Sequence, residues 1–96
     1  MKTFQDKVAV ITGAASGIGF GLAQAAAARG MKLVLADIES GALEQAAVEL
    51  EKAGAQLITV VTDVSKAASM ENLETRTMEA FGGVHLVFNN AGVGGG

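Results

Sequence analysis

The sequence predicts an α/β fold built on a doubly wound parallel sheet, and three observations indicate it. Four short β-rich runs recur at nearly even spacing, at residues 7–12, 32–36, 56–61 and 84–89. The segments between them have helical periodicity, so strands and helices alternate along the chain. The runs are almost continuously apolar, as in parallel strands that helices cover on both faces. Right-handed crossovers then connect a β-α-β-α-β-α-β unit, one half of a doubly wound sheet that is truncated after its fourth strand. For such a sheet we expect the strand order 3-2-1-4.

Three helices are expected, each with one apolar face and a glycine at its end. The face of the first comprises Ile18, Leu22, Ala25, Ala26 and Arg29. The face of the second comprises Leu43, Ala46, Ala47, Leu50 and Ala53. The face of the third comprises Met70, Leu73, Thr77, Ala80 and Phe81. Gly30, Gly54 and Gly82 follow these helices because a left-handed backbone there costs glycine nothing. Ser65 is expected to cap the third helix.

Composition narrows the classes of function. A chain of 96 residues that is 50% hydrophobic and 18% charged fits one small globular domain and excludes intrinsic disorder. The absence of cysteine excludes disulfides and zinc-thiolate sites. The net charge of -3 argues against nucleic acid or an anionic membrane as a partner.

Residues 8–28 carry no formal charge, which is a property of membrane-spanning helices and of the apolar part of signal peptides. Four glycines interrupt this stretch, and its opening is β-branched. We therefore expect a strand, a glycine turn and a buried helix instead.

The strongest chemical signal is a glycine-rich turn between the first expected strand and the first expected helix. It reads Thr-Gly-Ala-Ala-Ser-Gly-Ile-Gly over residues 12–19. Gly13 can form a tight turn, Gly17 lets a diphosphate approach the backbone, and Gly19 lets the helix pack against the strand. The helix N-terminus favours an anion, and the Ser16 hydroxyl can meet a ribose or phosphate oxygen. We expect a dinucleotide here; the alternative is a turn that only allows tight packing.

The second signal is Asp37, at the end of the second expected strand. A carboxylate there can hold both hydroxyls of the adenosine ribose, and it repels a 2′-phosphate. The next residues, Ile38, Glu39 and Ser40, include no Arg or Lys to receive such a phosphate, and Ala15 in the glycine turn is not basic. The sequence therefore favours NAD over NADP. The alternative is that Asp37 is a solvated loop acid.

Three motifs in this order resemble those of the short-chain dehydrogenase/reductase family. They are the glycine turn, Asp63-Val64 after the third strand, and Asn-Asn-Ala-Gly over residues 89–92. The resemblance covers the whole chain and implies a Rossmann-type fold. Residues 1–96 would be the N-terminal half of a single NAD(P)-binding domain, with no second domain. The resemblance also implies a cytoplasmic oxidoreductase, a homodimer or homotetramer, that transfers hydride between nicotinamide and a small alcohol or ketone.

The resemblance also implies roles for single residues. Asp63 would hydrogen-bond the adenine amino group, Val64 would border the ring, and residues 90–92 would line the cofactor. Asn89 would tie the fourth strand to its neighbours. Without the resemblance, Asp63 fits a carboxylate that caps a helix equally well, and the two asparagines would indicate a turn. The expected cofactor-binding residues are Gly13, Ser16, Gly17, Ile18, Gly19, Asp37, Ile38, Asp63, Val64, Asn90, Ala91 and Gly92.

The sequence departs from the family pattern in its chemistry. By the resemblance, such enzymes use a Tyr-x-x-x-Lys pair and a serine in their C-terminal half, and the tyrosine exchanges a proton with the substrate oxygen. This chain contains no tyrosine and stops just after the fourth expected strand. We therefore expect no catalytic residue and no metal ligand in it, and no turnover by the chain without the missing C-terminal half.

Two other functions stay open at this point. One is a nucleotide-binding module without catalysis. The other is an S-adenosylmethionine-dependent methyltransferase, which also has a glycine turn and an acid after the second strand; the glycine spacing and the Asn-Asn-Ala-Gly segment weigh against it. A P-loop nucleotidase is excluded because no Gly-Lys-Ser/Thr follows the glycines. His85, the one histidine, is expected at the end of the sheet opposite the site and outside catalysis.

Overall fold

A computed structural model describes residues 4–90 of the chain, and these form one parallel sheet with three connecting helices. The strands are β1 (Val8–Thr12), β2 (Lys32–Asp37), β3 (Leu57–Val61) and β4 (Leu86–Asn89). The helices between them are α1 (Gly17–Ala28), α2 (Ser40–Lys52) and α3 (Ala67–Phe81). The strands lie in the order β3-β2-β1-β4, so the predicted doubly wound sheet is confirmed.

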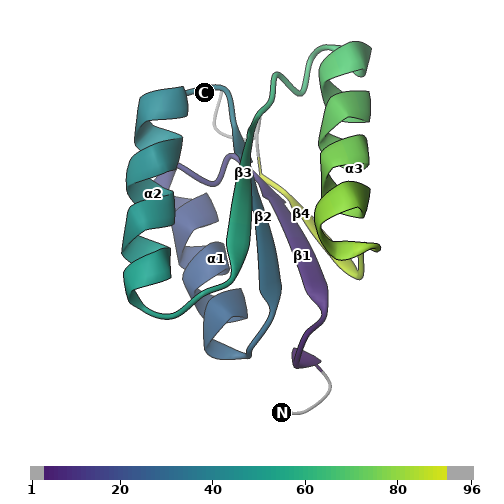
Figure 1. Cartoon of the computed structure of the whole chain (residues 1–96). Helices are drawn as coiled ribbons and strands as arrows, with labels where there is room; N and C mark the ends of the chain where they lie inside the picture. Colours follow the sequence, from purple (N-terminus) through teal and green to yellow (C-terminus); the bar gives the residue numbers. More distant parts are fainter. Residues whose placement is uncertain (1–3, 91–96) are drawn as a thin grey trace.

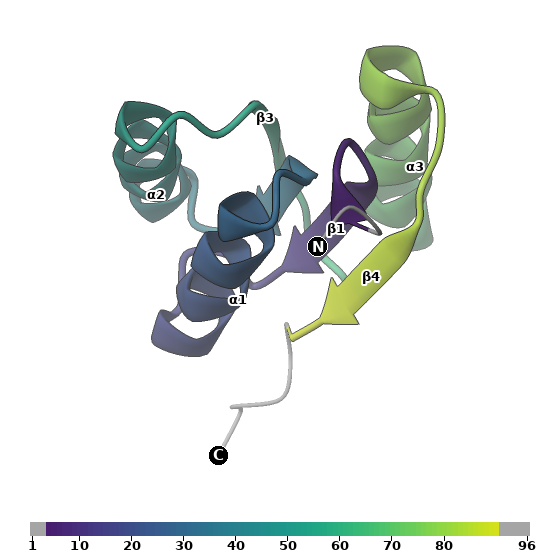
Figure 2. The ribbon, with the colours of Figure 1, turned by 90° about the horizontal axis from the view of Figure 1, so that it is seen from below.

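The helices form a layer on each side of the sheet. α1 and α2 lie on one side and α3 on the other (Figure 1), and the view from below shows the same separation (Figure 2). The chain steps from β1 to β2 and β3 in one direction, then returns past β1 to reach β4. Because crossovers are right-handed, this reversal moves α3 to the opposite face. It also creates a switch point between β1 and β4, where such sheets bind ligands.

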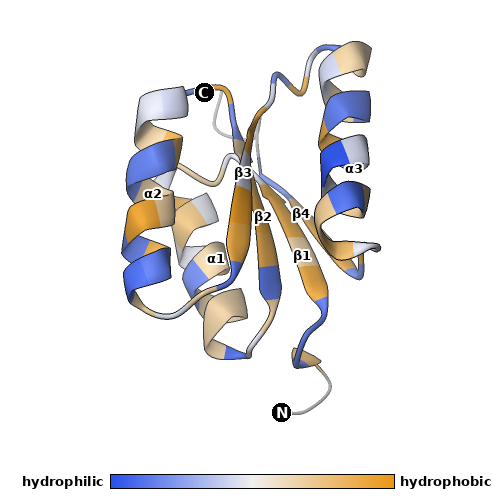
Figure 3. Ribbon diagram, in the orientation of Figure 1, coloured by the Kyte–Doolittle hydropathy of each residue, from blue (hydrophilic) through white to orange (hydrophobic). Residues whose placement is uncertain are grey.

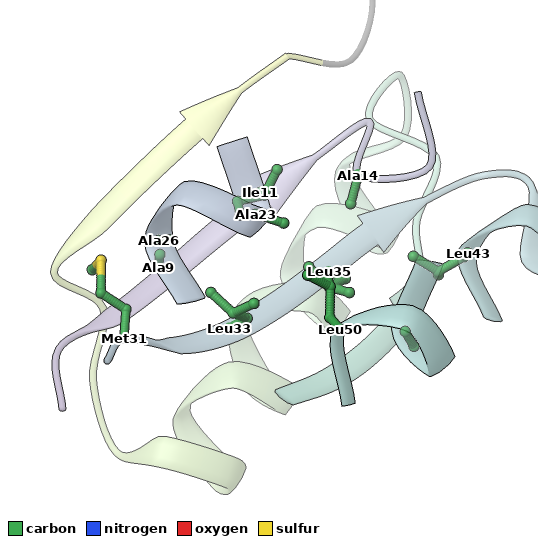
Figure 4. Close-up of a cluster of buried hydrophobic side chains, with 11 residues drawn as sticks. Ala9, Ile11, Ala14, Ala23, Ala26, Met31, Leu33, Leu35, Leu43 and Leu50 are labelled. Carbon is green, nitrogen blue, oxygen red and sulfur yellow. The ribbon is translucent and has the colours of Figure 1, made fainter. Parts of the chain in front are cut away.

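The larger core lies between the sheet and the pair α1 and α2 (Figure 4). It consists of Ala9, Ile11, Ala14, Ala23, Ala26, Met31, Leu33, Leu35, Leu43, Ala47 and Leu50. Alternate strand residues point to the other face, where a smaller cluster lies under α3. That cluster consists of Val8, Val10, Val34, Ala36, Val60 and Leu73. Both faces bury apolar side chains, so the strands are hydrophobic along most of their length (Figure 3).

The three predicted glycine stops are confirmed. Gly30, Gly54 and Gly82 follow α1, α2 and α3 with φ angles of 79°, 94° and 74°. This left-handed backbone reverses the direction of the chain where it leaves each helix. After α1, for example, the N–H of Gly30 donates to the carbonyl of Ala27 at 2.9 Å. A carbonyl of the last helical turn is thereby satisfied without a side chain.

The predicted apolar face of α1 is confirmed only in part, since Ala26 is buried and Leu22 is half-buried. The residues that α1 buries are Gly19, Ala23 and Ala26, whereas Ile18 is 69% exposed and Ala25 is also exposed. Gly19 packs against the glycine turn, and this contact rotates the helix so that its small residues face the sheet. The face chosen by helical periodicity therefore includes the buried Ala26 but misses the buried Gly19 and Ala23.

The other two helices follow their predicted faces more closely. α2 buries Leu43, Ala46, Ala47 and Leu50 as predicted, although Ala53 lies after its last turn and is exposed. α3 buries Leu73 and Thr77, but Met70 and Ala80 are exposed. The predicted Ser65 cap of α3 is wrong: Lys66 holds the N-cap position, with no side-chain hydrogen bond.

The uncharged stretch at residues 8–28 forms β1, the glycine turn and α1, as predicted. Within residues 4–90, no helix is both long enough and apolar enough to cross a membrane.

Gly82→Ala should lower the free energy of unfolding by about 1 kcal/mol, because a left-handed backbone strains any residue with a Cβ. The surrounding space is open, so no steric clash adds to this effect. Gly41→Ala is the matched control: Gly41 also faces open space but lies inside α2, where alanine should raise stability by about 0.5 kcal/mol. Urea unfolding of both variants measures the difference, and equal changes of the same sign would contradict it.

Candidate functional site

The candidate site lies where the carboxyl ends of β1, β2 and β4 meet the start of α1. The glycine turn at residues 13–16 connects β1 to α1 and crosses this edge of the sheet. The turn is held to β2 by the N–H of Ala14, which donates to the carbonyl of Ala36 at 3.0 Å. The site thus occupies the switch point between β1 and β4, as the order of strands requires.

The three glycines of the motif, Gly13 in the turn and Gly17 and Gly19 in the first turn of α1, meet three different steric conditions. Gly13 has a φ of 65°, which reverses the chain directly after β1. A Cβ added at Gly19 would overlap the carbonyl oxygen of Gly13 and lie 2.7 Å from its carbon, so α1 can approach the turn only without a side chain there. A Cβ added at Gly17 would have no atom within 4 Å. The protein interior therefore does not require a glycine at position 17.

Ser16 is the N-cap of α1. Its Oγ accepts a hydrogen bond from the N–H of Gly19 at 3.1 Å and donates one to the carbonyl of Gly13 at 2.8 Å. The N–H groups of Gly17 and Ile18 have no carbonyl partner within α1, because the first N–H groups of a helix precede its hydrogen-bond ladder. They give the start of α1 its partial positive charge.

Asp37 is half-buried at the end of β2 and faces the glycine turn. Its Oδ2 accepts a hydrogen bond from the N–H of Ala15 at 3.0 Å, and its Oδ1 accepts one from the N–H of Glu39 at 3.0 Å. The carboxylate is therefore anchored, which does not fit a solvated loop acid. Each oxygen keeps a lone pair for a further donor. Ile38 follows directly and is 57% exposed.

Asp63 lies two residues beyond the end of β3, next to Val64, which is 37% exposed. Its Oδ1 accepts hydrogen bonds from the hydroxyl of Ser65 at 2.6 Å and from the N–H of Ser65 at 3.0 Å. The Ser65 hydroxyl, and next its N–H, hold the pKa of Asp63 below its usual value. This turn also explains why Ser65 does not cap α3. Within residues 4–90, the Oδ2 of Asp63 accepts no hydrogen bond.

The two asparagines at the end of β4 bind β1 and the turn. The hydroxyl of Thr12 donates to Asn89 Oδ1 at 3.0 Å, which is the tie between strands expected of Asn89. The N–H of Asn90 donates to Thr12 Oγ1 at 3.0 Å, and its side-chain Nδ2 donates to Ser16 Oγ at 2.9 Å. The predicted Ala91 and Gly92 lie outside the described residues. The structure therefore joins Asn90 to the glycine turn, whereas Asp63 makes no hydrogen bond to either.

Sequence reasoning missed three residues that organise this edge of the sheet. Thr12 is 1% exposed and links β1 to β4 through its hydroxyl. The backbone N–H of Ala15 donates a hydrogen bond to the Asp37 carboxylate, and the hydroxyl of Ser69 accepts one from the N–H of Asp63 at 2.8 Å. The one available signal was a threonine inside an apolar run, since a buried hydroxyl requires a partner. Backbone contacts such as that of Ala15 leave no signal in the residue type.

His85 lies at the opposite end of the sheet, as expected. Its side-chain Nδ1 accepts a hydrogen bond from the backbone N–H of Val8 at 3.0 Å, and the backbone N–H of His85 donates one to the carbonyl of Val8. The side chain thus extends the pairing of β1 and β4 beyond the strands. Among residues 4–90, no three His, Asp or Glu side chains gather in a way that could hold a metal ion.

Comparison with known proteins decides the family. The family described as short chain dehydrogenase matches this chain over residues 7–96. The chain belongs to the short-chain dehydrogenase family. One similar member is the CLA biosynthesis dehydrogenase/reductase of Lactiplantibacillus plantarum, 45% identical over 93 residues, which are 97% of this chain and 32% of that protein. Another is the levodione reductase of Leifsonia aquatica, 45% identical over 96% of this chain and 35% of that protein.

Solved structures of short-chain dehydrogenases share the fold. A short chain dehydrogenase/reductase from Burkholderia phymatum, crystallised in complex with NAD, matches with a TM-score of 0.87 and 52% identity, over 91% of this chain and 31% of that chain. A hydroxysteroid dehydrogenase from Escherichia coli matches with a TM-score of 0.91 and 32% identity, over 96% of this chain and 39% of that chain. The chain spans about a third of the length of the curated relatives that it matches.

Gly19→Ala should disrupt the glycine turn, because its Cβ would overlap backbone atoms that cannot rotate away. We expect a loss of about 1–3 kcal/mol in the free energy of unfolding, as for other overpacked sites. Gly21→Ala is the matched control, since Gly21 is exposed in the same helix and its added Cβ would have no atom within 4 Å. Chemical denaturation compares the two; a Gly19→Ala variant as stable as Gly21→Ala would contradict the packing argument.

Proposed function

We propose that this chain is the dinucleotide-binding part of an NAD-dependent short-chain oxidoreductase. The observation that carries the proposal is the contrast between two glycines at the start of α1. Packing requires a glycine at position 19, whereas Gly17 faces open space and packing does not require it. A glycine that packing does not require, at the start of a helix, suits a ligand that needs the backbone bare. The NAD complex of the Burkholderia phymatum enzyme supports this assignment.

In this proposal, the dinucleotide is held by the residues predicted from the sequence. The diphosphate meets the N–H groups of Gly17 and Ile18 at the start of α1. The adenosine ribose meets Asp37, and the adenine lies near Ile38 and between Asp63 and Val64. Gly13, Ser16, Gly19 and Asn90 shape the turn. On the family resemblance alone, Ala91 and Gly92 are also proposed as cofactor-binding residues.

Asp37 is proposed to select NAD over NADP. The hydrogen bonds from Ala15 and Glu39 hold its carboxylate in place, and each of its oxygens can accept one ribose hydroxyl. A 2′-phosphate at the same place would meet a fixed negative charge. The three residues after Asp37 are Ile38, Glu39 and Ser40, so this segment supplies no cation to offset that charge.

The reaction of the whole protein is proposed from its family. When bound, the nicotinamide would supply the group that accepts or gives hydride, and a small alcohol or ketone would be the second reactant. The catalytic tyrosine, lysine and serine of such enzymes would come from sequence beyond this chain, as the third of the relatives' length that it spans suggests. We further propose a cytoplasmic homo-oligomer, on the family resemblance alone.

Titration of the purified chain with NADH, followed by nucleotide fluorescence, tests the proposal. We expect saturable binding of NADH that NAD displaces. S-adenosylmethionine in parallel tests the methyltransferase alternative and should not bind. Binding of S-adenosylmethionine without binding of NADH would overturn the proposal.

Gly17→Ala should separate binding from folding. Because its Cβ meets no protein atom, the variant should keep the stability of the unmodified chain within about 0.5 kcal/mol. The same Cβ would stand where the diphosphate must approach, so NADH affinity should fall at least about tenfold, or about 1.4 kcal/mol. Thermal unfolding and NADH titration of one preparation give both quantities. Unchanged affinity would show that no diphosphate binds at this position.

Asp37→Ala should weaken NAD more than NADP. Loss of hydrogen bonds to a charged acceptor should reduce NAD affinity by about 1.5–3 kcal/mol. The affinity for NADP should fall less, because the variant no longer repels the 2′-phosphate. Affinities of the unmodified chain and the variant for both cofactors, measured at one ionic strength, give the change in preference. Glu39→Ala serves as the control for charge alone. Equal losses for NAD and NADP would show that Asp37 does not set the preference.

A further inference from the structure

The side chain of Asn90 has a defined orientation at the edge of the glycine turn. Its Nδ2 lies 2.9 Å from Ser16 Oγ and 3.4 Å from the carbonyl oxygen of Gly13. A carbonyl can only accept a hydrogen bond, so the NH₂ group of the amide must face the turn. The backbone N–H of Asn90 donates to Thr12 Oγ1 at 3.0 Å, which fixes the residue from its other side.

The hydroxyl of Ser16 is saturated by this arrangement. Its single hydrogen is donated to the carbonyl of Gly13, and its oxygen accepts from the N–H of Gly19 and from Asn90. A hydroxyl has one hydrogen and two lone pairs, so all of its bonding capacity is in use. None remains for a phosphate or ribose oxygen. The three partners come from the turn, from α1 and from the end of β4.

We propose that Ser16 and Asn90 form a positioning pair that couples the end of β4 to the glycine turn. Through it, two segments 74 residues apart set the shape of one anion-binding turn. Ser16 then acts on the dinucleotide through the turn and not by touching it. The pair rests on the proposed function for its effect on NADH, but its effect on the turn exists without any ligand.

The pair can be tested with a double-mutant cycle of Ser16→Ala, Asn90→Ala and both together. The first readout is hydrogen exchange of the Gly19 amide in the ligand-free chain, because that N–H donates to Ser16 Oγ. We expect each single variant to speed its exchange about 3- to 10-fold, the usual range for one hydrogen bond. The double variant should match Ser16→Ala, since Asn90 acts through the hydroxyl.

The second readout is the affinity for NADH, measured on the same four proteins well below their melting temperatures. Each single variant should weaken binding by about 3- to 10-fold, and the two effects should not multiply. Ser16→Thr keeps a capping hydroxyl and should restore both readouts. Ser40→Ala and Asn72→Ala are the matched controls and should change neither readout, because Ser40, the first residue of α2, and Asn72, in the second turn of α3, are both exposed.

Multiplicative effects, or an Asn90→Ala variant with unchanged exchange and affinity, would overturn the proposal. Asn90→Ser, which shortens the side chain but leaves it polar, replaces Asn90→Ala if circular dichroism shows that the alanine variant is unfolded. If the unmodified chain binds no NADH, the function proposed above fails. The exchange readout still decides whether the pair exists.

Discussion

The architecture depends on one close contact, between the first turn of α1 and the backbone that leaves β1. Gly19 lies so near the carbonyl of Gly13 that no side chain fits between them. This contact fixes the rotation of α1, and therefore which of its small residues meet the sheet. It also aims the start of the helix across the carboxyl edge of the strands. Packing and ligand geometry are thus two results of the same steric requirement.

Around this contact, backbone groups do much of the work that side chains perform at other sites. The N–H groups of Ala15 and Glu39 anchor Asp37, and the N–H of Ala14 holds the turn to β2 through the carbonyl of Ala36. The carboxylate of Asp37 therefore stands at a fixed position through hydrogen bonds from backbone groups. Such a site is organised before a ligand arrives, which reduces the ordering that binding must supply.

The parallel sheet with helices on both faces could be predicted, because continuous apolar runs and right-handed crossovers indicate it without side-chain detail. The strand order was expected from the doubly wound fold type and not from the residues. The roles of Gly13 and Gly19 could also be predicted, since few residues satisfy those steric conditions. The buried face of α1 could not, because in an alanine-rich helix periodicity does not distinguish Ala23 from Ala25. The Ser65 hydroxyl bonds the Asp63 carboxylate instead of capping α3. Which of these two short-range hydrogen bonds forms cannot be predicted from the residue types.

The position of β4 has a consequence for the order in which the chain acquires its structure during synthesis. β1 is fully buried between β2 and β4, yet its two partners emerge at very different times. β2 can pair with β1, and β3 with β2, once residue 61 is made, but β4 begins only at Leu86. At about 5–20 residues per second, the nascent chain spends on the order of seconds with one edge of its most apolar strand unpaired. Chaperones that recognise extended apolar segments would find this edge during that interval.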